Sequence, residues 1–459
     1  MLEKLRNIFQ VPELRRRILF TLALFVVYRL GEHIPTPGVN AVALMQAFRS
    51  QANTLFGMYD MFVGRAFSRA TIFALGIMPY ISASIILQLL GAVIPYFEKL
   101  RKEGDEGQKK ITQLTRYGTV LIAIVQSLAY SIFLVNLGAS QGQTVVANPG
   151  FAFYFSTVIT QTAGTILVMW LGEKITEFGI GNGISLIIFV NILGGLPNAL
   201  AAGIDSWRGG NLNLLQVAGM LTIIVAVVAA VVVMTQATRK IPVQYAKRMV
   251  GRRMYGGQST HIPLRVNTAG VIPIIFASSI MILPTTIAGF FPPGSAIGSL
   301  GQFFTRTSVV FNILYALIII FFTYFYTAVV LNPNDLAENM RKYGGFVPGI
   351  RPGKKTAEYI DRVLSRITLP GAIFLALIAV LPDLLLAFFK VPVLAFGGTS
   401  VLIVVGVALD TLQQVESHLL MRHYEGVVKS SRLRGRQSRW EVNPSDRQSP
   451  RGLVFRSSF

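Results

Sequence analysis

Side chains that commonly carry catalysis are scarce in this sequence of 459 residues. It contains no cysteine, which excludes disulfides, thiolate metal sites and cysteine nucleophiles. Its four histidines are not paired at the spacing of helical metal ligands within an apolar stretch, and neither an HExxH nor a GxSxG motif occurs. We therefore expect no metal site, no catalytic residue and no cofactor.

Two glycine-rich stretches superficially resemble nucleotide-binding loops. Gly179, Gly181 and Gly183 form a GxGxG run, and a second stretch runs from Gly349 to Thr356. Phosphate-binding fingerprints require a preceding strand, which neither stretch has, and the second also has the wrong spacing. The first is better explained as a turn before a helix. Nucleotide binding is not indicated.

Carboxylates that could couple transport to an ion gradient are also misplaced. Such transporters usually need acidic residues deep inside their membrane helices. Asp383, Asp410 and Glu416 instead fall toward the ends of apolar stretches, where water or headgroups can solvate them. This placement counts against an ion-coupled transporter, which nevertheless stays an alternative, with a membrane enzyme ranked below it.

The elements that hold these residues are apolar helices. The chain is 52% hydrophobic and 14% charged, whereas soluble domains average about 25% charged residues. We predict an all-α integral membrane fold with ten transmembrane helices of roughly 15 to 24 residues each. The predicted spans begin near Ile18, Thr71, Thr119, Phe151, Ile184, Leu214, Ala269, Val309, Ile367 and Thr399.

The distribution of Lys and Arg predicts the orientation of these spans. If the spans alternate in direction, 35 of the 42 cations fall on one side, and positive segments stay cytoplasmic, so both termini are expected inside. A five-span unit repeated in tandem must be inverted, which predicts two inverted five-helix halves, residues 1–205 and 206–435. No repeat is visible in the sequence itself. Residues 436–459 form a basic, polar tail, for which we expect disorder.

The second predicted span has an unusual interior and an unusual neighbour. Residues 71–90 carry no charge, but Pro79 removes a backbone donor and Ser82 brings a polar group to membrane depth. The preceding residues 55–69 are amphipathic but too short and too charged to span, and we predict a half-inserted, re-entrant helix. A short helix beside an interrupted span points to a solute path.

Two predicted cytoplasmic loops, residues 238–268 and 332–366, are long and basic. Positive-inside bias explains part of their charge. Their length favours a second role, as docking surfaces for a phosphate backbone or an acidic protein face.

Six long motifs resemble the SecY family of protein-conducting channels, in its bacterial form. They are LGIMPYISASI at residues 75–85, NPGFAFYF at 148–155, WLGEKITEFGIGNGIS at 170–185, STHIPLRVNTAGVIP at 259–273, FVPGIRPG at 346–353 and FGGTS at 396–400. The resemblance implies a passive channel for unfolded polypeptides, without enzymatic activity of its own. It also implies an hourglass-shaped pore.

The resemblance assigns a role to isoleucines that spacing alone marks only as packing residues. They would form the pore ring, a narrow apolar constriction that dewets against ions yet offers a sliding chain no group to bind. By the same resemblance, residues 55–69 with Asp60, Phe62 and Arg65 would be a plug beneath it. The predicted ring residues are Ile77, Ile81, Ile184, Ile188, Ile275 and Ile403.

Ser82, Gln126 and Asn267 match a polar cluster of that family at a lateral gate, which opens between spans two and three on one side and seven and eight on the other. Interhelical hydrogen bonds of about 0.6 to 2 kcal/mol each could hold the gate closed. The apolar run of a signal peptide could replace bonds this weak, so that apolar segments leave into the bilayer.

The resemblance also implies partners and a location. These are SecE and SecG subunits, the SecA ATPase, the ribosome, signal peptides, nascent chains and membrane lipids. Arg252 and Arg253 match a ribosome-facing pair, and Arg351 matches an arginine that couples the motor. The expected location is the bacterial cytoplasmic (inner) membrane.

Overall fold

The computed structural model describes residues 11–49, 55–141, 145–210, 213–245, 248–250, 253–255, 259–288, 308–389 and 398–437. Residues 17–411 form one compact unit, and all the contacts discussed below lie within it. Residues 1–16 and 412–459 form a second unit, whose described part contains the start of the first helix and the end of the last. Most of the predicted tail, residues 438–459, lies outside the described residues.

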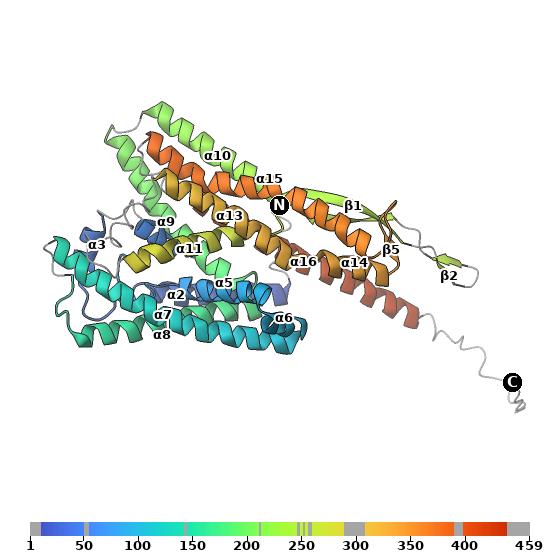
Figure 1. Ribbon diagram of the computed structural model, residues 1–459, viewed down its shortest axis with the longest axis horizontal. Helices are drawn as coiled ribbons and strands as arrows, with labels where there is room; N and C mark the ends of the chain where they lie inside the picture. Colours follow the sequence, from blue (N-terminus) through green and yellow to red (C-terminus); the bar gives the residue numbers. More distant parts are fainter. Residues whose placement is uncertain are drawn as a thin grey trace, which may run out of the picture. The chain divides into compact units, whose positions relative to one another are not determined.

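Helices dominate the described residues (Figure 1). The first half of the chain contains α2 (Pro12–Gly31), α3 (Ala41–Arg49), α4 (Leu55–Phe62), α5 (Met78–Val93), α6 (Pro95–Lys102), α7 (Asp105–Gln141), α8 (Phe151–Phe178) and α9 (Gly183–Arg208). The second half contains α10 (Leu214–Gln236), α11 (Ile272–Ala288), α13 (Val309–Val330), α14 (Pro333–Lys342), α15 (Lys354–Phe389) and α16 (Gly398–Gln437).

A described helix overlaps each of the ten predicted spans. By length and composition, seven helices in the described part of the chain could cross a membrane, or eight if the bent pair α5 and α6 counts as one span. The chain is therefore a mostly helical, multi-span protein. Ten membrane crossings, and their division into inverted halves, remain a prediction.

The second predicted span begins later than the sequence suggested. Residues 72–77 form turns, and α5 starts at Met78 with Pro79 in its first turn. A proline is tolerated there, because the first amide groups of a helix have no intrahelical acceptor. The interpretation of Pro79 as an interruption inside a span was wrong, since it starts the helix.

The predicted re-entrant helix is shorter than expected. Only Leu55–Phe62 is helical, and residues 63–70 form turns. Gly64 and Arg65 both have positive φ values, of 69° and 67°, which a right-handed helix cannot accommodate. The segment is thus one short helix followed by a compact loop.

The prediction of an all-α fold was wrong in the two basic loops. Strands β1 (Thr238–Tyr245), β4 (Ser259–Arg265) and β5 (Gly345–Phe346) form an antiparallel sheet of order β4-β1-β5, while β2 (Arg248–Val250) pairs with β3 (Arg253–Tyr255). One sheet therefore joins both loops. Side chains from strands, α14 and α15 share a small apolar core of Ile241, Val243, Leu264, Met340, Val347, Ile360 and Leu364.

The expected turn before the fifth span is confirmed. Residues 179–182 are not helical, and the Asn182 side chain accepts hydrogen bonds from the amides of Ile184 and Ser185 at the start of α9. A Cβ on Gly183 would lie 2.0 Å from the carbonyl oxygen of Gly172 in α8. The glycine run thus serves close packing of α9 on α8.

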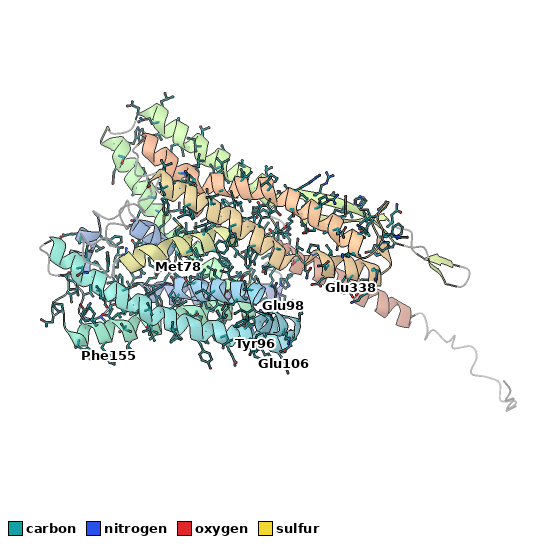
Figure 2. All side chains as sticks on the ribbon, viewed as in Figure 1. Met78, Tyr96, Glu98, Glu106, Phe155 and Glu338 are labelled. Atoms are coloured by element: carbon teal, nitrogen blue, oxygen red, sulfur yellow. The ribbon has the colours of Figure 1, made fainter. Side chains whose placement is uncertain are left out.

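Apolar side chains also cover outward faces of the helices, as an apolar membrane environment requires. Phe155 of α8 and Tyr96 of α6, both labelled in Figure 2, are largely exposed. The capped helix α10 is almost entirely apolar, yet only 6% of its most apolar window is buried. These faces suit contact with lipid or with another apolar helix.

Candidate functional site

Isoleucines from four helices contribute to the same large apolar core of the molecule. Five of the six predicted ring residues are buried there, and Ile184 is half-buried and packs against it. The buried ones are Ile77 and Ile81 at the start of α5, Ile188 of α9, Ile275 of α11 and Ile403 of α16.

Local structure explains why these side chains point the same way. Ile77 and Ile81, and likewise Ile184 and Ile188, are four residues apart, which places each pair on one face of its helix. Because α5 begins at Met78 and α9 at Gly183, both pairs lie in the first turns of their helices. Each pair therefore presents both side chains on the same side of the start of its helix.

The predicted plug packs against this core. Phe62, at the end of α4, and the following Val63 are 3% and 1% exposed and belong to the same apolar cluster. Helix α4 contacts both α9 and α11. Arg65, in contrast, is exposed.

Two tyrosines that the sequence did not single out hold the plug loop. The Tyr59 hydroxyl donates to the carbonyl of Leu75, at 2.8 Å, and the Tyr130 hydroxyl donates to the carbonyl of Phe67, at 2.6 Å. The Phe67 ring lies 5.0 Å from that of Tyr59 and 4.5 Å from that of Tyr130. In the sequence, the aromatic residues of this amphipathic segment gave no indication that Leu75 and Tyr130 would be hydrogen-bonded to it.

Asp60 brings a carboxyl group into the plug. Its Oδ1 accepts a hydrogen bond from the Ser68 amide at 2.8 Å, which ties α4 to the end of the loop. Burial raises the pKa of the Asp60 carboxyl above its usual value, and the Ser68 hydrogen bond and the charge of Arg65 only partly oppose this. Burial therefore disfavours the ionised form.

The predicted gate residues lie in, or just before, helices that pack on one another: Ser82 in α5, Gln126 in α7 and Asn267 in the turn before α11. Helix α11 packs on α5 and α7, and the Ser279 hydroxyl of α11 donates to the Met78 sulfur of α5 at 3.6 Å. Ser82, Gln126 and Asn267 are all buried, but no hydrogen bond joins them among the described residues. Both amide atoms of Asn267 are buried without a partner there.

The comparisons with known proteins agree with this arrangement. The SecY family profile matches residues 71–412. A protein translocase subunit SecY from Escherichia coli (strain K12) is 48% identical over 426 residues, 92% of this chain and 96% of the relative. The corresponding protein from Aquifex aeolicus (strain VF5) is 44% identical over 94% of this chain and all of the relative.

The chain belongs to the SecY family. It is therefore a protein translocase subunit, which removes the ion-coupled transporter and the membrane enzyme as alternatives. Solved structures support the fold. A structure described as a protein conducting channel has a TM-score of 0.63 and 18% identity, covering 88% of this chain and 92% of its own. Sec61 in a canine ribosome-channel complex has a TM-score of 0.58 with the same coverage.

Of the predicted docking residues in this SecY-family chain, Arg351 is exposed in the turn between β5 and α15. Its carbonyl accepts a hydrogen bond from the Thr356 hydroxyl at 2.9 Å, which fixes the turn to the first residues of α15. Arg253 lies in β3, and Arg252 lies outside the described residues.

Sequence reasoning missed one polar cluster beside the plug. Asn191 is 1% exposed in the apolar helix α9, and Glu32, just after α2, is 2% exposed. A polar residue within an otherwise apolar span was a usable signal, because such a residue needs a partner. Its partners come from other parts of the chain, and the sequence alone could not identify them.

Proposed function

We propose that this chain is the central subunit of a translocation channel in the bacterial cytoplasmic membrane. It is a passive pore for unfolded secretory polypeptides and releases apolar segments sideways into the bilayer. The observation that supports this best is the gathering of isoleucines from α5, α9, α11 and α16 in one core, with Phe62 of the plug packed in the same core.

In the resting channel, the six isoleucines form the constriction and the plug lies against it. Branched apolar side chains exclude hydrated ions from a narrow passage, and they offer a moving polypeptide nothing to bind. A substrate displaces the plug. Tyr59 and Tyr130 favour its return, since their hydrogen bonds join the plug to residues outside it and are lost on displacement.

The lateral gate runs along the seam of α11 with α5 and α7, where Ser82, Gln126 and Asn267 are buried. In the described part of the chain, the seam has few polar ties, and the buried Asn267 amide, which has no hydrogen-bond partner there, weakens it further. A gate of this kind can open for the apolar run of a signal peptide.

The chain crosses the membrane ten times, with residues 1–205 and 206–435 as inverted halves and both termini cytoplasmic. Support comes from the one-sided distribution of Lys and Arg and from the helices that overlap all ten predicted spans. The basic sheet and α14 then lie on the cytoplasmic side.

Partners supply the energy, so the chain itself is not an enzyme. The platform of β1, β4, β5 and α14 presents basic residues to SecA or the ribosome, while SecE and SecG pack on apolar helix faces.

With Arg351→Glu, we expect normal membrane insertion but loss of SecA-driven export in vesicles. The same charge change at exposed Arg208, which lies outside both predicted docking loops, is the control; equal export by both variants would exclude this docking role.

The ring is tested by a polar substitution. With Ile188→Asn, we expect a higher resting ion conductance in planar bilayers, because an amide in the constriction lets water and ions persist there. The matched control is Ile313→Asn on α13, where the side chain is 57% exposed. Resting conductance that is equal in Ile188→Asn and the unmodified chain would refute the ring.

A further inference from the structure

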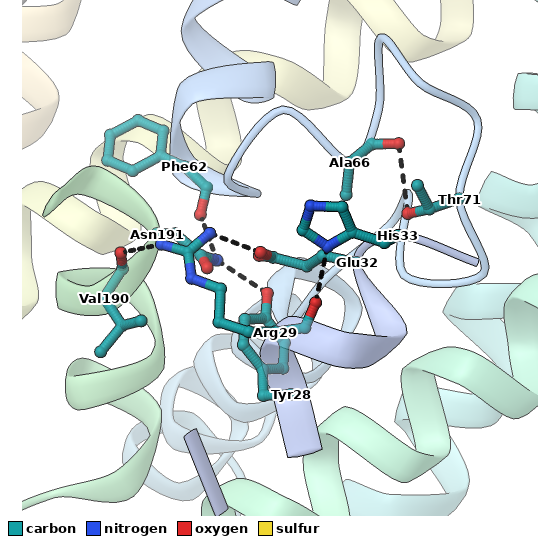
Figure 3. Close-up of polar contacts among 9 residues, drawn as sticks. All are labelled: Tyr28, Arg29, Glu32, His33, Phe62, Ala66, Thr71, Val190 and Asn191. Carbon is teal, nitrogen blue, oxygen red and sulfur yellow. Dashed lines mark hydrogen bonds and ion pairs between the residues drawn. The ribbon is translucent and has the colours of Figure 1, made fainter. Parts of the chain in front are cut away.

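A buried polar cluster touches the end of the plug helix. Asn191 of α9 donates through Nδ2 to the carbonyl oxygen of Phe62 at 2.9 Å and to the Tyr28 hydroxyl at 2.8 Å. Phe62 is the last residue of α4, so no amide of the same helix donates to its carbonyl oxygen. Asn191 thus caps the plug helix from a neighbouring helix (Figure 3).

An ion pair braces this cap from the side. Arg29, in the last turn of α2, donates to Glu32 at 2.5 Å and to the carbonyl of Val190 at 2.6 Å. Val190 directly precedes Asn191, and Figure 3 shows the guanidinium lying between Glu32 and Val190. The pair therefore ties the end of α2 to the turn of α9 that carries the cap.

Two glycines provide the space for this arrangement. A Cβ on Gly194 of α9 would lie 1.9 Å from the Arg29 guanidinium, so the arginine can approach only a glycine. A Cβ on Gly64 of the plug would lie 2.5 Å from Oε1 of Glu32 and 3.0 Å from Oδ1 of Asn191. The plug loop is thus shaped to fit directly against both side chains.

The side chains that form this cap all come from residues 1–205, the predicted N-terminal half. They are Tyr28, Arg29, Glu32 and Asn191. The loop after the plug is held there too, because the Thr36 amide donates to the Ala70 carbonyl at 2.7 Å and the Ile72 amide donates to the Ile34 carbonyl at 3.0 Å. From the C-terminal part, the described hydrogen bond to the plug is the weak one from Ser400 to the Met61 sulfur, at 3.7 Å.

We propose that Asn191, braced by the Arg29–Glu32 pair, is the positioning residue that anchors the plug to α9 and the end of α2. This inference rests on the proposed role of residues 55–70 as a plug. The anchored plug stays with the N-terminal part of the chain when α11 moves away from α5. Release then requires Asn191 to give up the Phe62 carbonyl.

The anchor is also built to be released. Oδ1 of Asn191 is a buried acceptor without a hydrogen-bond partner among the described residues, whereas the Glu32 carboxylate interacts with both Arg29 and the Tyr28 hydroxyl. A buried acceptor such as this Oδ1 destabilises the docked arrangement. The cluster therefore combines one hydrogen bond to the plug end with a built-in penalty, which suits a contact that must open in use.

The chain has no cysteine, so a single introduced thiol reports on docking. Val63→Cys places this thiol at a position 1% exposed, where a membrane-permeant maleimide reaches it only when the plug leaves. In that background, Asn191→Leu keeps the size but removes both donors. We expect labelling about tenfold faster, the effect of roughly one lost hydrogen bond. Asn198→Leu, at an exposed position in the same helix, is the control.

Conservative variants separate positioning from general stability. Glu32→Gln keeps an oxygen for Arg29 and adds an amide donor toward Asn191, so labelling should be no faster than in the unmodified chain, whereas Glu32→Ala should label about tenfold faster. Gly64→Ala should also speed labelling, and Gly104→Ala, which has a similar φ of 73° but open space around it, should not.

Two results would overturn the anchor: equal labelling of Asn191→Leu and Asn198→Leu, or faster labelling accompanied by a lower thermal unfolding temperature of the whole chain. Faster labelling without a rise in ion conductance would support the anchor but contradict the proposed sealing role of the plug. The two failures are therefore distinguishable.

Discussion

Asp60 shows how a single residue can set the balance of the plug. Its carboxyl is buried, and burial raises its pKa above the ordinary value of 3.8. Because the docked plug binds this proton more tightly than a displaced, solvated plug would, docking is strongest below that ordinary value. It weakens as the pH rises through the raised pKa.

Asp60→Asn should remove this dependence. The amide oxygen can still accept the hydrogen bond from Ser68, but no charge develops in the buried site. We expect tighter docking at neutral pH and slower maleimide labelling of Val63→Cys. Relative to the rate of the same thiol in the denatured chain at each pH, which corrects for ionisation of the thiol itself, the variant's labelling should change little between about pH 5 and about pH 7. Parallel pH profiles in the variant and the unmodified chain would contradict this explanation.

At the residue scale, the sequence predicted some roles from residue type, but it could not predict which groups a residue would contact. Pro79 stood out as an unusual residue in an apolar stretch, whereas Asn191, which is equally unusual in its span, was not singled out. Their meaning depended on where a helix starts and on which carbonyl lies opposite. Neither property is local in sequence, which is why Pro79 was misinterpreted and Asn191 was left without a role.

Among the elements, the short amphipathic helix α6 links the α5 side of the seam to α13, which packs on α11. Pro95 cannot continue α5, so the chain bends by 98° and starts α6. From there Arg101 donates to the Val329 carbonyl at the end of α13, at 2.5 Å, where the helix dipole favours a cation. The Asp335 carboxylate, in the first turn of α14, attracts the neighbouring Lys102.

Arg101→Ala should therefore loosen the seam slightly. Since Arg101 is exposed, we expect only about 0.5 kcal/mol, or a roughly two-fold shift toward the open gate. A short bismaleimide crosslink between cysteines at Met78 and Ser279 reports closure, because these side chains touch across α5 and α11. Its yield should fall in Arg101→Ala and stay constant in Lys99→Ala, an exposed control on the same helix. Equal yields in the two variants would exclude a stabilising role for the hydrogen bond from Arg101 to the Val329 carbonyl.

The elements also show the limit of pattern reading. Hydropathy located every predicted span on a described helix, because apolar length is a local property. It missed the sheet. Strand β5 pairs with Gln244 and Tyr245 of β1 from about a hundred residues away, and a two-residue strand has no periodicity to detect.

At the scale of the whole molecule, we propose that a translocating polypeptide passes through the isoleucine core. Family membership shows a protein translocase subunit, and the structure brings Ile188 and Ile403 into one apolar cluster from α9 and α16. A path between them would bring the translocating polypeptide into contact with both side chains. Since the chain lacks cysteine, that contact can be mapped one position at a time.

The most direct test uses a secretory chain that carries one cysteine and is arrested during export. Disulfides should form with Ile188→Cys and Ile403→Cys, which lie in the core, and not with Ile313→Cys on an exposed face of α13. Crosslinks confined to Ile313→Cys, or absent at both core positions while export proceeds, would contradict a pore through the isoleucine cluster.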